Sequence, residues 1–212
     1  MIIIKKFTET DFEFKEVTRL YNLVSHDDKE HVDDMKEGWA VRDKSLQRDR
    51  FLLYDDDTVL GFLGYAQGRD KNHRNCYFNI YLDPEYNGNG YRKLLYDRML
   101  EAIQTFDCNR LYADIYEHPN YDQFKKFLLE NKFYVGLKIR EYSLDLESVD
   151  LTKYSSLLKK IDSKGIKFYD GKNEMKDFPH HYKKLEELGW KFGKDFPMPE
   201  GIIHTRQPFK QF

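Results

Sequence analysis

The chain has 212 residues, of which 40% are hydrophobic and 34% are charged. This balance is typical of one folded domain, or of a domain with an added fragment, and excludes an intrinsically disordered chain. The 35 basic and 37 acidic residues are interspersed and give a net charge of -2, which argues against a nucleic-acid partner. No apolar run is long enough to cross a membrane, so we expect no membrane association.

The cysteines and histidines predict neither a disulfide framework nor a metal site. Cys76 and Cys108 are the two cysteines, and no signal peptide precedes the first expected strand. We therefore expect two free thiols in a cytoplasmic protein. The adjacent His180 and His181 would face different directions on a helix, and no third ligand follows at metal-binding spacing, so we predict no metal.

The first part of the chain predicts a strand, two helices and three further strands. Apolar residues recur at helical spacing in two segments, and Asp55-Asp56-Asp57 separates two runs rich in β-formers, as in a hairpin. On the last of these strands Phe78, Ile80 and Leu82 share one face. The expected elements are, in chain order, strand 2–6, helix 14–24, helix 32–39, strands 50–54 and 58–65, and strand 75–82.

A turn rich in glycine and asparagine, residues 87–90, joins the strand ending at Leu82 to a strongly periodic helix, residues 91–103. Two interpretations of this turn stand side by side. Unpaired amides at a helix N-terminus, together with the helix dipole, form a ready site for a pyrophosphate. Alternatively, the turn is a tight loop that needs positive φ at Gly88 and Gly90.

The remainder predicts a closing strand and an added C-terminal segment. After a strand over 111–115 and a helix over 121–128, Phe133–Leu146 is expected to form a long strand, so the order is β-α-α-β-β-β-α-β-α-β, a mixed α/β fold. The following helix over 151–161, strand over 165–169 and helix over 182–190 weakly repeat the start of the chain. We therefore expect a domain over 1–146 and a segment over 147–212 too small to fold alone, which packs on the first domain or on another subunit.

The stretch Leu82-Asp83-Pro84-Glu85-Tyr86 and the turn after it resemble motif A of the GCN5-related N-acetyltransferase (GNAT) superfamily. Asn87 falls at the family's Arg/Gln position, Gly90 at its central Gly and Arg92 at its final Gly/Ala. The element order agrees over most of the chain, and the C-terminal segment resembles the start of a second domain in tandem GNAT proteins. The resemblance implies a GNAT fold, with a mixed, mostly antiparallel sheet flanked by helices, and acetyl transfer from acetyl-CoA to a small-molecule amine. The residues that it assigns to the cofactor are Tyr81, Leu82, Asn87, Gly88, Asn89, Gly90, Tyr91, Arg92 and Asn120.

The family's usual proton donor is missing from this chain. Leu128 stands where the family has a Tyr, and Lys132 stands where it has a Gly. Glu117 is a candidate base and Tyr121 a candidate replacement acid, because both follow the strand at which the family opens its cleft. The alternative readings are a solvated strand-end charge for Glu117 and a helix N-cap for Asn120.

Three functional hypotheses follow. The first is an acetyl-CoA-dependent N-acetyltransferase. The second is a degenerate domain that binds CoA or an acyl-CoA without turnover, suggested by Asn87, Arg92 and Leu128. The third is an interaction protein whose residues 147–212 dock a partner or complete a homodimer.

Overall fold

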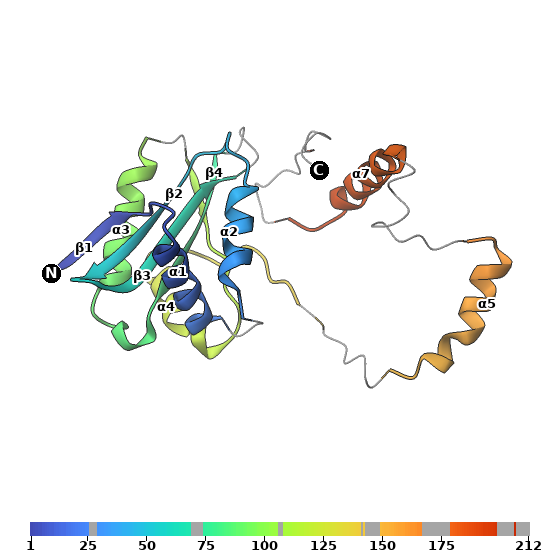
Figure 1. Cartoon of the computed structure of the whole chain (residues 1–212), viewed down its shortest axis with the longest axis horizontal. Helices are drawn as coiled ribbons and strands as arrows, with labels where there is room; N and C mark the ends of the chain where they lie inside the picture. Colours follow the sequence, from blue (N-terminus) through green and yellow to red (C-terminus); the bar gives the residue numbers. More distant parts are fainter. Residues whose placement is uncertain are drawn as a thin grey trace. The chain divides into compact units, whose positions relative to one another are not determined.

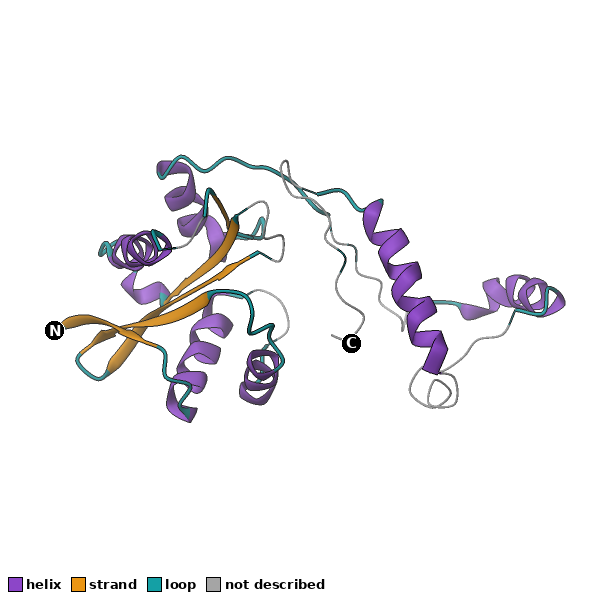
Figure 2. Cartoon of the chain, turned by 90° about the horizontal axis from the view of Figure 1, so that it is seen from above, coloured by secondary structure: helices purple, strands orange, loops and turns teal. Residues whose placement is uncertain are grey.

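The computed structural model describes residues 1–25, 29–68, 74–105, 108–140, 142, 149–166, 179–198 and 206. The described residues divide into two compact units, the first ending at Val135 and the second beginning at Gly136. The first unit holds a five-stranded sheet with helices on both of its faces (Figures 1 and 2).

The sheet has the strand order β1-β2-β3-β4-β5, so each strand lies beside its neighbour in sequence. The first four strands are antiparallel, and β5 pairs with β4 in parallel. The predicted β2–β3 hairpin is present, and its turn holds Asp56 at a φ of 50°. The strands are β1 (Ile2–Lys6), β2 (Arg48–Asp55), β3 (Thr58–Gln67), β4 (Asn75–Leu82) and β5 (Arg110–Tyr112).

Helices α1 and α2 cover one face of the sheet, and α3 and α4 cover the other. A capping box starts α1: the Thr10 side chain accepts from the Glu13 N–H, and the Glu13 carboxylate accepts from the Thr10 N–H. The helices are α1 (Asp11–Val24), α2 (Val32–Ala40), α3 (Tyr91–Ile103) and α4 (Asp122–Glu130), with single 3-10 turns η1 (Pro84–Tyr86) and η2 (Pro119–Tyr121).

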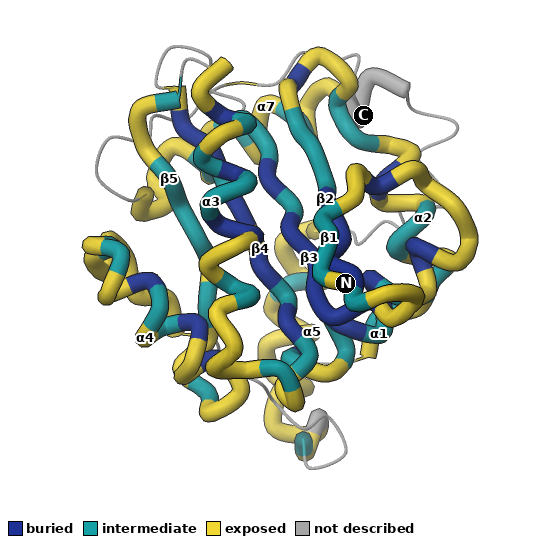
Figure 3. Tube along the Cα trace, turned by 90° about the vertical axis from the view of Figure 1, so that its left-hand side faces the viewer, coloured by how far each residue is buried: buried dark blue, intermediate teal, exposed yellow. Residues whose placement is uncertain are grey.

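Alternating side chains of the strands fill two hydrophobic cores. Phe78, Ile80 and Leu82 of β4 are buried on the α3/α4 face, as their spacing predicts. Leu52, Tyr54 and Phe62 belong to the core on the α1/α2 face. Covering both faces buries many residues of the central strands, which Figure 3 shows as dark blue segments in the middle of the sheet.

The predicted closing strand is the main error in the element order. Residues 133–140 belong to no strand, and of the rest of Phe133–Leu146 only Tyr142, also outside any strand, is described. A strand needs a partner edge, yet Tyr134, Val135 and Ile139 are exposed, at 75%, 60% and 69%. Similarly, the strand expected over 111–115 pairs only as far as Tyr112.

The second unit consists of helices with exposed apolar side chains. It contains η4 (Leu151–Tyr154), α5 (Ser155–Ser163) and α7 (Pro179–Lys194), which agree with the two helices expected there. The strand expected over 165–169 does not include Gly165 or Ile166, and its other residues lie outside the described ranges. None of the described helices is both long enough and apolar enough to span a membrane.

Candidate functional site

The sheet opens between β4 and β5. Asn75–Tyr77 pair with Arg110–Tyr112, but β4 continues to Leu82 after β5 has ended. Residues 78–82 of β4 therefore have a described strand partner, β3, on one side only. Unpaired strand edges present N–H and C=O groups that can bond an extended ligand.

Hydrogen-bond alternation shows which residues of β4 face this opening. The Asp83 N–H donates to the Leu60 carbonyl at 2.9 Å, and the Gly68 N–H donates to the Asn75 carbonyl at 2.6 Å, so odd-numbered residues of β4 bond to β3. The backbone groups of even-numbered residues, including Leu82, therefore point toward the opening. Of the two backbone amides expected to serve the site, Leu82 has this orientation and Tyr81 does not.

The glycine turn after β4 has the left-handed backbone that its sequence predicts. Gly88 has a φ of 90° and Gly90, the N-cap residue of α3, has a φ of 78°. A Cβ at either position would meet nothing within 4 Å, so the backbone there is openly accessible. Asn89 between them is exposed. The turn therefore needs glycine for its conformation and also leaves room for a ligand against its amides.

The N-terminus of α3 has no side-chain cap, and its first turn contains two basic residues and no acidic one. Lys93 pairs with Asp97 one turn further on, whereas Arg92 forms no ion pair within the described residues. The first N–H groups of a helix have no internal acceptor, and cations there oppose the helix dipole. This arrangement differs from α1, where a full capping box satisfies the same groups. An anion bound at the turn would remove the imbalance.

Arg92 supplies a second, independent sign of an anion site. Its guanidinium donates to the Asn87 side-chain oxygen at 3.2 Å and lies 5.3 Å from the Phe124 ring centre. Its Nε is buried without a hydrogen-bond partner, and burial lowers the pKa of Arg92 to about 10. Buried charges are normally paired, so the Arg92 guanidinium is suited to bind a phosphate group. The residues of the turn fit a pyrophosphate.

Tyr81 and Tyr121 approach each other from different elements. The Tyr81 ring stacks on Phe62 at 5.5 Å and meets Tyr21 edge-on at 5.5 Å. Burial raises the pKa of Tyr81, and the nearby Tyr21 and Tyr121 phenols raise it further. Tyr121 is itself buried, at the end of η2. The two phenols are therefore close enough to interact electrostatically, and the Tyr81 phenol stays protonated at neutral pH.

The other predicted residues occupy less enclosed positions. Glu117 is 71% exposed and lies 3.9 Å from the Lys125 ammonium. His118, rather than Asn120, is the N-cap of η2, because its Nδ1 accepts from the Asn120 N–H at 3.2 Å. The Asn120 side chain is exposed. Tyr91, half-buried, packs against the α3/α4 core, where Leu128 is buried and holds no proton to donate.

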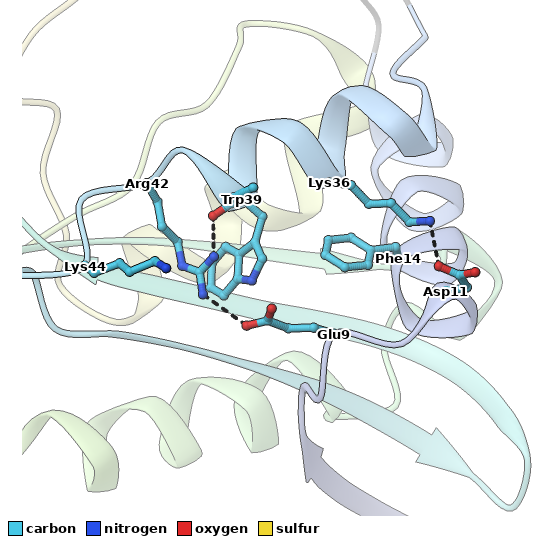
Figure 4. A pocket seen from close by; sticks show the side chains of 8 residues that line it. Glu9, Asp11, Phe14, Lys36, Trp39, Arg42 and Lys44 are labelled. Carbon is cyan, nitrogen blue, oxygen red and sulfur yellow. Dashed lines mark hydrogen bonds and ion pairs between the residues drawn. The ribbon is translucent and has the colours of Figure 1, made fainter. Parts of the chain in front are cut away.

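Sequence reasoning missed a group of arginines around Trp39 of α2. A cavity of about 430 Å³ is lined by Trp39, Phe14 and several charged residues, among them Arg42 (Figure 4). Arg48 and Arg50 alternate on β2 and so share one face, the signal that could have revealed them. The described residues contain no cluster of three or more His, Cys, Asp and Glu side chains suited to a metal ion.

Comparison with known proteins identifies the family. The model of the acetyltransferase (GNAT) family matches residues 13–125, which include the turn, α3 and the start of α4. The chain therefore belongs to the GNAT acetyltransferase family, whose co-substrate is acetyl-CoA. No curated protein matches the sequence significantly.

Solved structures share the fold at low sequence identity. The protein yncA from Salmonella typhimurium, solved with its cofactor acetyl-CoA, is 16% identical, with 68% of this chain and 86% of that chain covered and a TM-score of 0.54. Aminoglycoside antibiotic 6'-N-acetyltransferase AAC(6')-Ih from Acinetobacter baumannii is 13% identical, with coverage of 69% and 99% and a TM-score of 0.52. AAC(6')-IG from Acinetobacter haemolyticus is 16% identical, with coverage of 68% and 99% and a TM-score of 0.51. These likenesses establish the GNAT fold.

Proposed function

We propose that this chain transfers the acetyl group of acetyl-CoA to the amine of a small molecule. The observation that carries the proposal is the uncapped N-terminus of α3, next to the open edge of β4, with the buried Nε of Arg92 beside it lacking a hydrogen-bond partner among the described residues. In the reaction the amine nitrogen bonds to the thioester carbonyl carbon, the carbon–sulfur bond breaks, and the CoA thiolate takes up a proton. The products are an N-acetylated amine and CoA.

The residues at the opening supply what this reaction needs. Amides of the turn 87–92 and the Arg92 guanidinium hold the phosphates, and Asn87 orients that guanidinium. The Leu82 N–H, which faces the opening, donates to the carbonyl oxygen where negative charge develops. Tyr121 donates the proton to the leaving sulfur, and the exposed Glu117 accepts the amine proton through water. Asn120, in the same loop, bonds the cofactor arm.

Calorimetric titration with acetyl-CoA and with CoA tests the cofactor site. We expect micromolar binding, about -8 kcal/mol, and its loss in Gly90→Glu, because the new carboxylate faces the same amides as the phosphates. Gly165→Glu is the matched control, since it adds the same charge and the same side chain at a glycine that also has a positive φ, 66°, and where a Cβ also meets nothing within 4 Å. If Gly90→Glu binds as tightly as the unaltered chain, the phosphates do not lie at this turn.

A second candidate function is cofactor binding without turnover. The buried Leu128 at the family's proton-donor position favours it. An acetylation assay with a broad panel of primary amines separates the two functions, because measurable release of free CoA thiol that depends on an amine is expected of an enzyme alone. Tyr121→Phe should then lower kcat at least tenfold, about 1.4 kcal/mol of transition-state stabilisation.

We also propose that residues 1–146 are the catalytic domain and that residues 147–212 join two copies of the chain. Exposed apolar side chains on one side of α7 support this proposal: Leu185, Leu188 and Phe192 are 52%, 62% and 70% exposed. Both cysteines are free thiols, which fits a reducing cytoplasm.

A further inference from the structure

Two guanidinium groups enclose Trp39 on the α1/α2 face of the sheet. The central carbon of Arg42 lies 3.5 Å from the centre of the Trp39 ring, and that of Arg50 lies 3.6 Å from it. Two groups cannot occupy one position, so distances this short place them on opposite faces of the indole. Arg42 donates to the Trp39 carbonyl and, at 3.0 Å, to the Glu9 carboxylate, which Figure 4 shows at the cavity.

Arg50 and Trp39 both hold a buried donor that lacks an acceptor. The Nη1 of Arg50 and the Nε1 of Trp39 are buried and make no hydrogen bond within the described structure. A buried donor without a partner is costly, and two of them in stacked groups mark one place where an acceptor is missing. Arg42, on the other face of the indole, is not in this position, because it donates to the Trp39 carbonyl and pairs with the Glu9 carboxylate.

The positive charge at this place is only partly compensated, because Glu9, the described carboxylate that acts on Arg50, is already paired with Arg42. Within the described residues no carboxylate forms an ion pair with Arg50, whereas Arg42 and Arg48 add positive charge beside it. Burial, reinforced by Arg42, lowers the pKa of Arg50 to about 10. The guanidinium nevertheless remains charged at neutral pH. A negatively charged group would supply both the missing acceptor and the missing counter-charge.

The strand register places Arg50 on the same face of the sheet as residues at the open edge of β4. Arg50 pairs with Gly64 of β3, and Gly64 pairs with the exposed Asn79 of β4, so all three point to the α1/α2 face. Asn79 lies beside the open edge of β4, two strand spacings or about 10 Å from Arg50. Phe62, 5.8 Å from Arg50 and stacked on Tyr81, lies along the same path.

We infer that the acceptor amine carries a carboxylate or phosphate group, which binds Arg50 and Trp39 while the amino group reaches the open edge of β4. This inference rests on the proposed acetyl transfer. The cofactor phosphates are placed at α3, on the opposite face, which leaves the α1/α2 face to the acceptor. The span of about 10 Å, shortened by the reach of the arginine side chain, suits a molecule the size of an amino acid.

Matched amines test the inference on the unaltered chain. Each probe is an amine offered with and without its negative charge: the common L-amino acids against their C-terminal amides, and phosphoethanolamine against ethanolamine. We expect the charged member of at least one pair to be acetylated with a kcat/KM at least tenfold higher. Carboxylate and phosphate are distinguished by which pair responds. Equal rates within every pair, or faster acetylation of the uncharged members, would overturn the inference.

The variant Arg50→Met tests whether Arg50 causes the preference for the charged amine, and Arg98→Met is the matched control. Arg98 also lies over an aromatic ring, Phe51, but on the α3/α4 side and paired with Glu101. Arg50→Met should raise KM for the charged amine at least tenfold and leave KM for its uncharged partner within twofold. A uniform change in both members, or the same loss in Arg98→Met, would contradict a role in binding the anion.

Ligand binding without turnover gives a second readout. In Trp190→Phe, Trp39 is the remaining tryptophan, and its emission is followed during titration with N-acetylglycine and with inorganic phosphate. We expect saturable change with at least one anion, reduced at least tenfold in affinity by Arg50→Met. No response to either anion would overturn the inference and leave a buried water as the acceptor. Acetyl-CoA titration of the same samples reports the proposed function separately, because Arg50 lies away from the phosphate turn.

Discussion

Arg19 shows how this chain satisfies an arginine from within the protein. Its guanidinium donates to the Asp83 carboxylate at 2.8 Å, the Glu16 carboxylate at 2.9 Å and the Val59 carbonyl at 2.7 Å, and the two carboxylates raise its pKa. Within the described residues neither Arg50 nor Arg92 forms an ion pair with a carboxylate, and burial lowers the pKa of each. The difference supports the proposal that ligands complete these two sites.

Arg92→Met tests this interpretation at the phosphate turn. We expect acetyl-CoA affinity to fall about tenfold to a hundredfold, the range given by 1.5–3 kcal/mol for a hydrogen bond to a charged group. The thermal midpoint should change little, because Arg92 forms no ion pair within the described residues and the substitution removes only an exposed hydrogen bond to Asn87 and the contact of the guanidinium with the Phe124 ring. Calorimetry and thermal unfolding measure the two quantities. A fall in stability with unchanged affinity would assign Arg92 to the fold instead.

Cys108 is expected to react at a lower pH than an ordinary thiol. Its hydrogen bond with the Cys76 thiol lowers the pKa of Cys108, while the same contact and burial raise the pKa of Cys76. The thiolate fraction of Cys108 therefore rises at a lower pH than that of an unperturbed thiol. Iodoacetamide labelling followed by mass spectrometry should show one modified site whose labelling midpoint lies below that of free cysteine, and this site should be absent in Cys108→Ser. Labelling of Cys76 in the folded chain would contradict the assignment.

At the scale of elements, β3 and α3 approach each other closely at Gly61. A Cβ there would lie 3.1 Å from both the Leu82 and Leu95 side chains and 3.3 Å from the Tyr81 carbonyl. Leu82 and Leu95 are almost fully buried, so neither can move aside without cost. The contact holds the N-terminal half of α3, and with it the glycine turn over residues 87–90, against the end of β4.

Gly61→Val should therefore destabilise the chain by about 1–3 kcal/mol through overpacking. Gly38→Ala in α2 is the control: a Cβ there meets nothing within 4 Å, so the change should stabilise the helix by about 0.5–1 kcal/mol. Urea unfolding curves with equal slopes compare the two variants. If both variants were destabilised to the same extent, the loss at Gly61 would not come from overpacking.

Periodicity and turn chemistry made most of the elements predictable. Alternating apolar residues defined β4 to its exact ends, and the glycines located the turn before α3. The prediction of a strand over Phe133–Leu146 was wrong for its described residues, although their composition suits a strand. A strand forms only where a partner strand is available, and this depends on residues far away in the sequence. The Trp39–Arg50 stack was missed for the same reason, since α2 and β2 meet only in the folded chain.

At the scale of the whole molecule, the two units are built differently. The first has two cores with many fully buried side chains, whereas the described side chains of α5 and α7 are exposed or only partly buried. A helix stabilised in water normally buries its apolar stripe. The exposed apolar residues of α7 therefore support the proposal that the C-terminal helices bind a second copy of the chain.

Light scattering tests the proposed dimer. We expect the full chain to have twice the monomer mass of 25.6 kDa and a chain ending at residue 146 to be monomeric. Leu188→Glu should shift the full chain to monomer, because it places a charge in the middle of the apolar side of α7. Acetyl-CoA affinity should stay the same in all three. A monomeric full chain would contradict the dimer.

The strand order also sets a sequence of folding events. The four antiparallel strands pair with their neighbours along the chain, whereas β5 joins β4 in parallel only after α3 has crossed the sheet. We expect the β4–β5 pairing, which has three paired residues, to form last. In native-state hydrogen exchange, amides of β5 should open before those of β2 and β3, so the edge at which we propose the cofactor binds should be among the first parts of the domain lost during partial unfolding.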